Sequence, residues 1–255
     1  MSGFKSLAQN DCNGHGTFRV HGIRFSAFAA AALGVILLLA LTVPPAEAGP
    51  PSSIDVSNFP ARLVSATLPA HWQLQTFPAI ASATEYSIVA DDLYGPVIRA
   101  RAAGSAAGLV RRITLDPRDY PILTWVWKVS KTLPGSSLTS RQGDDFPARL
   151  LVSFSTDFFS ATSGRTLCYV WATSEPVETM KESPYHQGVV TIVASSGGSA
   201  VGSWQQVRRN IVADYLRVYG EMPGVLRAVS LLSDTDDTAD SVTAWYGPIS
   251  LGSEP

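Results

Sequence analysis

Cysteine and histidine are scarce in this chain of 255 residues. It has two cysteines and four histidines, and only Cys168, His71 and His186 lie beyond residue 48. One remaining thiol cannot form an internal disulfide, so the fold is not a disulfide-stabilised scaffold. These side chains are also too few for a structural zinc site built from cysteine and histidine. Cys168 lies in an apolar segment, where we expect a small buried side chain.

Charged residues are also few, at 16% of the chain, and the two signs nearly balance. Residues 1–48 hold three of the 19 basic and two of the 21 acidic side chains, which leaves 16 and 19 and a net charge of −3. This balance gives no electrostatic reason to expect a nucleic acid or an anionic membrane surface as a partner.

The N-terminal part carries an uncharged apolar run over residues 25–43. Two arginines precede the run, and Ala46-Glu47-Ala48 follows it as a small-x-small cleavage site. We therefore predict a signal peptide over residues 1–48, an exported chain, and no stable membrane insertion after cleavage. The alternative is a retained anchor, because an apolar run of this length could span a bilayer.

Short extended runs broken by turn residues fill the rest of the chain. We predict a linker over residues 49–57 and a single domain over 58–255. The expected strands cover residues 85–90, 96–101, 107–115, 123–129, 148–154, 166–172, 189–195, 225–232 and 242–251. Helical spacing occurs only over 205–219, where a short helix and an extended segment with a helical turn both fit. The pattern predicts an all-β fold, a two-layer antiparallel β-sandwich with at most one short helix.

Aromatic residues gather on two of these strands. Trp125 and Trp127 share one face of the strand 123–129, and Tyr169 and Trp171 share one face of 166–172. Flat aromatic rings could stack on the apolar face of a sugar ring, so we include all four in the candidate ligand site. The alternative is that they fill the core, which the apolar residues on the same faces favour.

Charged residues form a second candidate set around the strand 148–154. Arg149 projects from one face of that strand, Asp144 and Asp145 precede it, and Lys128 projects from the strand before. One interpretation is a polar ligand pocket with Arg149 and Lys128 as donors and Asp145 as acceptor. The other is a structural ion pair that closes the loop. The candidate ligand-binding residues are Trp125, Trp127, Lys128, Asp144, Asp145, Arg149, Tyr169 and Trp171.

Metal and catalytic signals are weaker. The acidic turn 234–240 holds four carboxylates, but it lacks the glycine and the glutamate that an EF-hand loop requires. We expect a solvated turn and no cofactor, with calcium bound in another geometry as the alternative. No catalytic residue is predicted, although a carboxylate pair such as Asp145 with Asp214 or Glu221 could serve glycoside cleavage.

Several motifs occur together in a recognisable order: Tyr120-Pro121-Ile122-Leu123-Thr124-Trp125-Val126-Trp127-Lys128-Val129, Gly143-Asp144-Asp145 with Ala148-Arg149, Tyr169-Val170-Trp171-Ala172, Arg209-Asn210 with Asp214-Tyr215, Asp234-Thr235-Asp236-Asp237-Thr238 and Ala244-Trp245-Tyr246-Gly247. With them the chain resembles, from about Asn58 to Leu251, the exported bacterial family catalogued as domain of unknown function 3047. It differs from the family pattern at Asp237, usually Asn, and at Pro248, usually acidic. The resemblance implies a galactose-binding-like jelly roll, a class with many carbohydrate-binding modules, in the bacterial periplasm or outside the cell.

Together these features predict an exported, non-catalytic β-sandwich domain that binds a carbohydrate or similar polar ligand on the face carrying Lys128 and Arg149. An enzyme that acts on polysaccharide through paired carboxylates is one alternative. A structural partner domain in a periplasmic assembly is another. Fold likeness alone does not choose among these functions.

Overall fold

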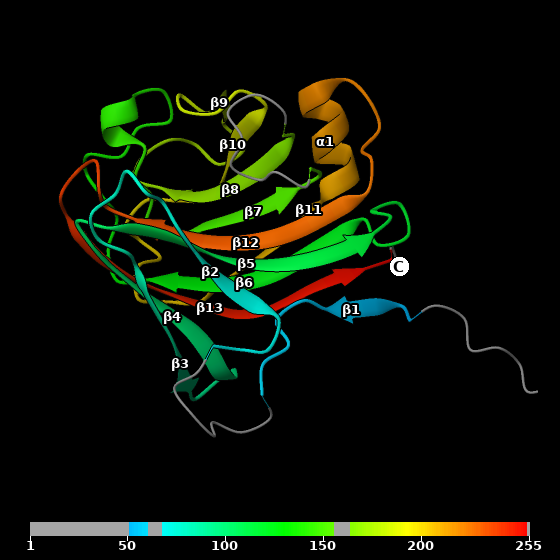
Figure 1. Ribbon diagram of the computed structural model, residues 1–255, viewed down its shortest axis with the longest axis horizontal. Coiled ribbons are helices and arrows are strands. Elements are labelled where there is room, and N and C mark those ends of the chain that lie inside the picture. Colours follow the sequence, from blue (N-terminus) through cyan, green and yellow to red (C-terminus); the bar gives the residue numbers. More distant parts are fainter. Residues whose placement is uncertain (1–50, 61–67, 156–163, 254–255) are drawn as a thin grey trace, which may run out of the picture. The chain divides into compact units, whose positions relative to one another are not determined.

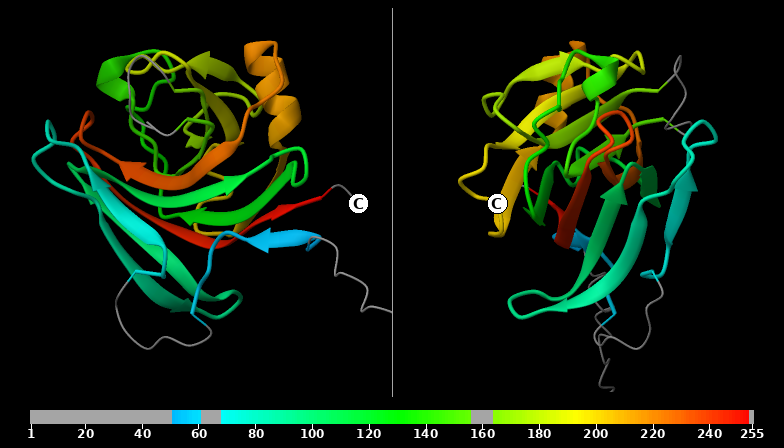
Figure 2. Two further views of the ribbon diagram at one scale, coloured as in Figure 1. Left: turned by 45° about the vertical axis from the view of Figure 1, so that its right-hand side comes forward. Right: turned by 90° about the vertical axis from the view of Figure 1, so that its left-hand side faces the viewer.

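The computed structural model describes residues 51–60, 68–155 and 164–253, all within one compact unit, Ala48–Pro255. The predicted signal peptide lies outside the described residues. Two curved β-sheets pack face to face (Figures 1 and 2), so the predicted two-layer β-sandwich is confirmed. Within the described ranges, no helix is long and apolar enough to cross a membrane.

One sheet has six antiparallel strands. Its order is β11-β6-β13-β4-β3, and β1 pairs with the end of β13. The strands are β1 (Ser53–Asp55), β3 (Glu85–Asp91), β4 (Gly95–Ala103), β6 (Ile122–Val129), β11 (Gln205–Asn210) and β13 (Ser241–Gly252).

The other sheet has seven strands in the order β2-β5-β12-β7-β8-β10-β9. They are β2 (Trp72–Thr76), β5 (Ala106–Leu115), β7 (Arg149–Ser153), β8 (Thr166–Ala172), β9 (Met180–Glu182), β10 (Val189–Ser196) and β12 (Leu226–Asp234). One pair departs from the predicted antiparallel pattern, because β10 runs parallel to β8. The chain crosses from β8 to β9 at the sheet edge and returns antiparallel to β9, which places β10 parallel beside β8.

The segment with helical spacing divides into two elements. Residues 205–210 form β11, because they pair with β6 along the sheet edge, and the helix α1 (Ile211–Tyr219) follows. The side chain of Asn210 caps the helix by accepting hydrogen bonds from the N–H groups of Val212 and Ala213. Gly220 ends it at φ 72°, a left-handed conformation that glycine adopts without strain. This is the single α-helix in the described residues.

Part of the predicted linker belongs to the sandwich. β1 pairs with β13, the side chain of Val56 is fully buried, and Ser57 is hydrogen-bonded to the backbone of Ile249. Residues 53–57 are therefore part of the folded domain, because strand pairing and burial hold them against β13. The strands β2 and β9 were not predicted, since one lies next to prolines and the other has only three residues.

The core lies between the sheets and is built from alternate residues of each strand. Its largest fully buried side chains include Trp125, Trp127, Tyr169, Trp171 and Tyr246. The ring centroids of Trp125 and Tyr169, from opposite sheets, lie 5.2 Å apart, and those of Trp127 and Trp171 lie 6.2 Å apart. Such aromatic pairs hold the two layers in register.

Candidate functional site: a charged pocket on the seven-stranded sheet

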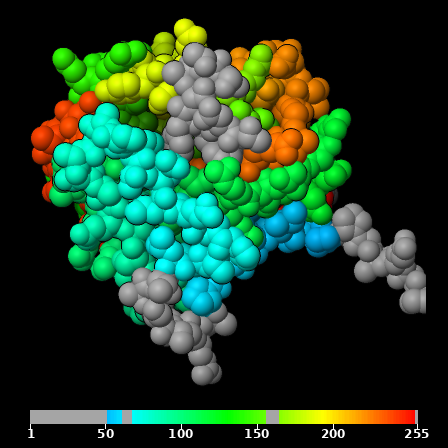
Figure 3. All heavy atoms as spheres, in the orientation of Figure 1, coloured from blue at the N-terminus to red at the C-terminus, as the bar shows by residue number. Residues whose placement is uncertain are grey.

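A pocket of about 440 Å³ opens on the outer face of the seven-stranded sheet. Alternation along β7 places it there, because Leu150 and Val152 point into the core while Arg149 and Leu151 line the pocket. Phe77 and Ile80, which follow β2, form part of its wall. In Figure 3 the cyan part of the chain, to which this segment belongs, covers the left and centre of the front of the molecule. The ionisable lining side chains are Asp144, Arg149, Cys168, Tyr185, His186, Asp234, Asp236 and Asp237.

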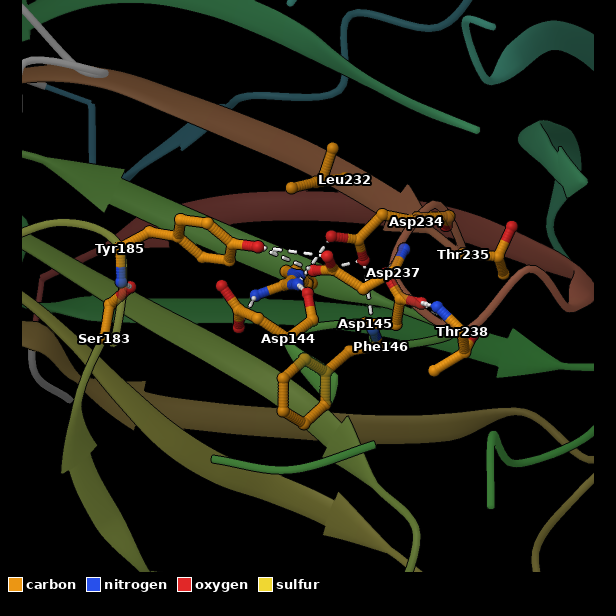
Figure 4. Close-up of polar contacts among 12 residues, drawn as sticks. Asp144, Asp145, Phe146, Ser183, Tyr185, Leu232, Asp234, Thr235, Asp237 and Thr238 are labelled. Carbon is orange, nitrogen blue, oxygen red and sulfur yellow. Dashed lines mark hydrogen bonds and ion pairs between the residues drawn. The ribbon is translucent and has the colours of Figure 1, made fainter. Parts of the chain in front are cut away.

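Arg149 is a buried residue of the pocket, and the carboxylates of Asp144 and Asp234 that bind it are labelled in Figure 4. Its Nε donates to Asp234 Oδ1 at 3.0 Å and its Nη2 to Asp234 Oδ2 at 2.5 Å, which is a two-bond fork. Its Nη1 donates to Asp144 Oδ1 at 3.0 Å, and its Nη2 also contacts the carbonyl oxygen of Asp144. The guanidinium lies over the ring of Phe146, 4.6 Å from the centroid. Burial alone would lower the pKa of Arg149, but the two carboxylates hold it above its ordinary value.

Asp234 was predicted to lie in a solvated turn, and the structure corrects this. It is the last residue of β12, it pairs with Ala106 of β5, and it is buried. Burial raises the pKa of Asp234 to about 7, although Arg149 and the N–H of Phe146 favour the ionised form. Both carboxylate oxygens accept hydrogen bonds, so the charged pair with Arg149 is the form that the geometry supports at neutral pH.

Asp145 lies behind the pocket wall with no exposed surface. Its Oδ2 accepts hydrogen bonds of 2.6 Å from both the N–H and the hydroxyl of Thr238. Its Oδ1 lies 3.4 Å from the N–H of Asp237. Asp145 therefore anchors the loop between β12 and β13, which carries Asp236 and Asp237 to the pocket.

The loop between β9 and β10 supplies Tyr185 and His186, which are not among the site residues predicted from the sequence. The hydroxyl of Tyr185 lies 3.0 and 3.1 Å from the two carboxylate oxygens of Asp237, and burial raises the pKa of Tyr185 to about 12. Burial lowers the pKa of His186, so its ring is neutral at neutral pH. Its Nδ1 is shielded from solvent and has no hydrogen-bond partner in the described part of the chain. No spacing in the sequence marks either residue.

Cys168 lines the pocket from β8, opposite Leu151 of β7. Burial raises the pKa of its thiol to about 12. The thiol is therefore protonated at neutral pH, which excludes it as a nucleophile there. The expected small buried side chain is confirmed.

The structure brings together only some of the predicted ligand-binding residues. Asp144 and Arg149 line the pocket, and Asp145 supports it. Four aromatic residues fill the core and offer no exposed ring to a ligand; they are Trp125, Trp127, Tyr169 and Trp171. Lys128 lies on the outer face of the other sheet, where its Nζ is 3.4 Å from Asp91 Oδ2. Lys128 and Arg149 thus project from opposite sides of the sandwich.

Three carboxylates in this region approach the spacing of a cation site. One oxygen each of Asp145, Asp234 and Asp236 lies within 4.8 Å of the others. However, Arg149 and Phe146 donate to both oxygens of Asp234, and Thr238 donates to Asp145. Calcium takes six to eight oxygen ligands, whereas here Asp234 pairs with the guanidinium of Arg149 and Asp145 accepts two hydrogen bonds from Thr238.

In the carboxylate pairs considered as a catalytic alternative, Asp145 with Asp214 or with Glu221, each carboxylate has its own partners. Asp214 accepts hydrogen bonds from Tyr169 and Arg209, and Glu221 pairs with Arg165. Neither residue lines the pocket. The carboxylates that do share it are Asp144, Asp234, Asp236 and Asp237.

These features define a β-sandwich protein with a charged pocket on the outer face of one sheet. A family model described as "Protein of unknown function (DUF3047)" matches residues 70–250, and the chain belongs to this family. The family resemblance found in the sequence motifs is thereby confirmed. No match was found among the curated proteins.

Solved structures with similar folds have low sequence identity to this chain. The family 11 carbohydrate-binding module of the cellulosomal cellulase Lic26A-Cel5E of Clostridium thermocellum is 10% identical at a TM-score of 0.44, covering 79% of this chain and 95% of its own. The family 30 module of the cellulase Cel9D-Cel44B of the same organism is 13% identical at 0.39, covering 79% and 98%. A family 12 xyloglucanase from Bacillus licheniformis is 6% identical at 0.40, covering 79% and 100%.

Proposed function

We propose that this protein binds a neutral carbohydrate in the pocket on the seven-stranded sheet. The observation that carries the proposal is the set of charged side chains in the pocket, where four carboxylates share the lining with one guanidinium that is already bound by two of them, Asp144 and Asp234. The volume of about 440 Å³ lies within the range of small-molecule sites.

The chemistry of the lining favours a ligand rich in hydroxyl groups. Arg149 donates its N–H groups to Asp144 and Asp234, so few of them remain to bind an anionic ligand. The carboxylates of Asp236 and Asp237 are acceptors, which sugar hydroxyls can satisfy by donating. Apolar and aromatic side chains in the same pocket can contact the C–H face of a sugar ring; they include Phe77, Ile80, Leu151, Tyr185 and Leu232.

Calorimetric titration with cellotetraose, xylotetraose and mannotetraose tests the proposal. Asp236→Asn and Asp237→Asn keep the shape of the pocket but weaken the acceptors. Each should raise the dissociation constant of the best ligand about tenfold, the effect of about 1.4 kcal/mol in a charge-assisted hydrogen bond. Asp116→Asn changes a partly exposed carboxylate in the loop after β5, away from the pocket; it is the matched control and should leave binding unchanged. Absence of binding by all three sugars, or equal affinity in all variants, would refute the proposal.

One observation favours an enzyme acting on polysaccharide as the second candidate. Asp234 and Asp236 share the pocket with one oxygen of each no more than 4.8 Å apart, and burial raises the pKa of both; retaining glycosidases also use two neighbouring carboxyl groups. Release of reducing ends from a bound polysaccharide, lost in Asp236→Asn, would support the enzyme. Binding without any release would support the binding module.

We also propose that the domain acts outside the cytoplasm. The apolar run over residues 25–43 and the Ala46-Glu47-Ala48 site support export. Expression of the full chain in a bacterium, followed by fractionation and N-terminal sequencing, should give a mature protein that starts at Gly49. A full-length chain in the cytoplasmic fraction would contradict export.

A further inference from the structure

The outer face of the six-stranded sheet carries a row in which cationic and aromatic side chains alternate. Strand register pairs Arg99 of β4 with Trp245 of β13, and Trp245 with Lys128 of β6. Trp204, directly before β11, extends the row past Lys128. Arg99, Trp245, Lys128 and Trp204 form what we term the ladder. Their chain neighbours, such as Tyr246, point into the core, so the ladder faces away from it.

Contacts within the ladder fix its two indoles. The Lys128 Nζ lies 4.7 Å from the ring centroid of Trp204 and 4.9 Å from that of Trp245. Asp91 accepts hydrogen bonds from Lys128 Nζ at 3.4 Å and from Trp204 Nε1 at 3.1 Å. Both indoles are partly exposed, so they present positioned aromatic surface to solvent.

Three arginines on this face have no hydrogen-bond or ion-pair partner among the described residues; they are Arg99, Arg101 and Arg208. Arg101 is exposed one row from the ladder, opposite Thr243. Arg208 lies on β11 opposite Thr124, four residues along β6 from Lys128, or about 13 Å. Glu85 is opposite Arg101 and makes no ion pair with it. The net charge of the side chains on this face is therefore positive, whereas the pocket on the opposite sheet is acidic.

We propose that the ladder face binds an acidic polysaccharide, a chain of sugars that carry carboxylates. The arginines would form charge-assisted hydrogen bonds with the carboxylates, and the rings of Trp245 and Trp204 would contact the sugar faces between them. This second site is separate from the pocket and does not depend on the function proposed for it.

An acidic glycan fits this face better than other anionic partners. Among the described residues, the face carries no exposed apolar helix that would enter a lipid layer, and its cations are spread along strands rather than clustered. A linear polysaccharide can follow the rows from Arg101 past the ladder toward Arg208. Its repeating carboxylates match cations that are spaced along the sheet.

A matched pair of sugars tests the proposal. Tetragalacturonate and α-1,4-linked galactotetraose differ in the carboxylate that replaces the hydroxymethyl group of each sugar. Calorimetric titration of the full domain at low salt should show binding of tetragalacturonate that depends on the arginines of this face, whereas any binding of galactotetraose, which the pocket could accept, should not depend on them. Because Arg101 and Arg208 are exposed and Arg99 is partly exposed, raising sodium chloride to 0.5 M should weaken tetragalacturonate binding about tenfold or more.

Variants separate this site from the rest of the molecule. Arg99→Gln with Arg101→Gln should weaken tetragalacturonate binding by about a hundredfold, about tenfold for each charge-assisted hydrogen bond that is removed. Arg118→Gln, an exposed arginine in the loop after β5, and Asp236→Asn in the pocket should leave it unchanged. Absence of tetragalacturonate binding, an equal loss of binding of both sugars in the double arginine variant, or weaker tetragalacturonate binding in the Asp236→Asn variant would overturn the proposal. Binding of DNA or of anionic vesicles in preference to the acidic sugar would overturn it as well.

Discussion

Replacing Arg149 by methionine should destabilise the protein in a way that depends on pH. The side chain is buried, and it neutralises Asp234 and Asp144 through hydrogen bonds of 2.5 to 3.0 Å. Removing one partner of a buried ion pair leaves a charge without a partner, which costs about 3–5 kcal/mol. We therefore expect Arg149→Met to lower the free energy of unfolding by about that amount at pH 9.

The sign of the pH dependence follows from Asp234. Its pKa in the folded protein is about 7, above the ordinary value of 3.8, so the stability that its protonated form contributes is lost as pH rises toward 7. Without Arg149 the pKa of Asp234 rises further, so the variant continues to lose stability as the pH rises above 7. The difference between wild type and variant should therefore grow by up to about 1.4 kcal/mol per pH unit above pH 7.

Urea denaturation at pH 6 and pH 9 measures this difference. Arg149→Met with Asp234→Leu should recover most of the stability, because an apolar pair replaces the buried ions. Lys128→Met is the matched control on the opposite face, where the pair with Asp91 is partly exposed at 20% and 14% of the side chains. It should cost less than about 1 kcal/mol. A loss below about 1 kcal/mol for Arg149→Met at pH 9, or the same loss at both pH values, would refute the reasoning.

Three further predictions concern the surroundings of the pocket. Asp145→Asn should lower the free energy of unfolding in urea by about 1–3 kcal/mol, because the amide is a weaker acceptor for the N–H and hydroxyl of Thr238 than the buried carboxylate. An unchanged free energy of unfolding would contradict the anchoring role of Asp145. Cys168 should not react with a thiol reagent at pH 8 until the protein unfolds, since its pKa is about 12; fast reaction of the native protein would show that the thiol is accessible. Tyr185→Phe should raise the pKa of Asp237 in an NMR titration, because the hydrogen bond that it removes favours the ionised carboxylate; an unchanged or lower midpoint would argue against that contact.

The sequence predicted the sandwich well because strand alternation is local. Leu150 and Val152 lie on one face of β7 and Arg149 and Leu151 on the other, as period-two alternation along a strand requires. Period-two alternation also placed Trp125 and Trp127 on the same face, and the core interpretation of these rings matches their full burial. The family motifs covered both parts of the Arg149 network, around Asp144 and around Asp234.

Alternation could not predict which strands share a sheet. Lys128 and Arg149 come from consecutive strands of the expected pattern, but β6 and β7 belong to different sheets, so the two cations project in opposite directions. The pairing of Arg149 with Asp234 joins residues 85 positions apart, and no local pattern encodes that contact. Tyr185 and His186 lie in an irregular loop, where position depends on the docking of the loop rather than on periodicity.

The most direct test of the pocket as the ligand site is an amide NMR titration of the mature domain with the neutral oligosaccharide that binds best. Shift changes should concentrate at residues 144–149, at 185–186 and at 234–237, which surround the pocket from three separate segments. Shift changes confined to other surfaces, or no saturable change at all, would contradict the claim that this pocket binds a carbohydrate.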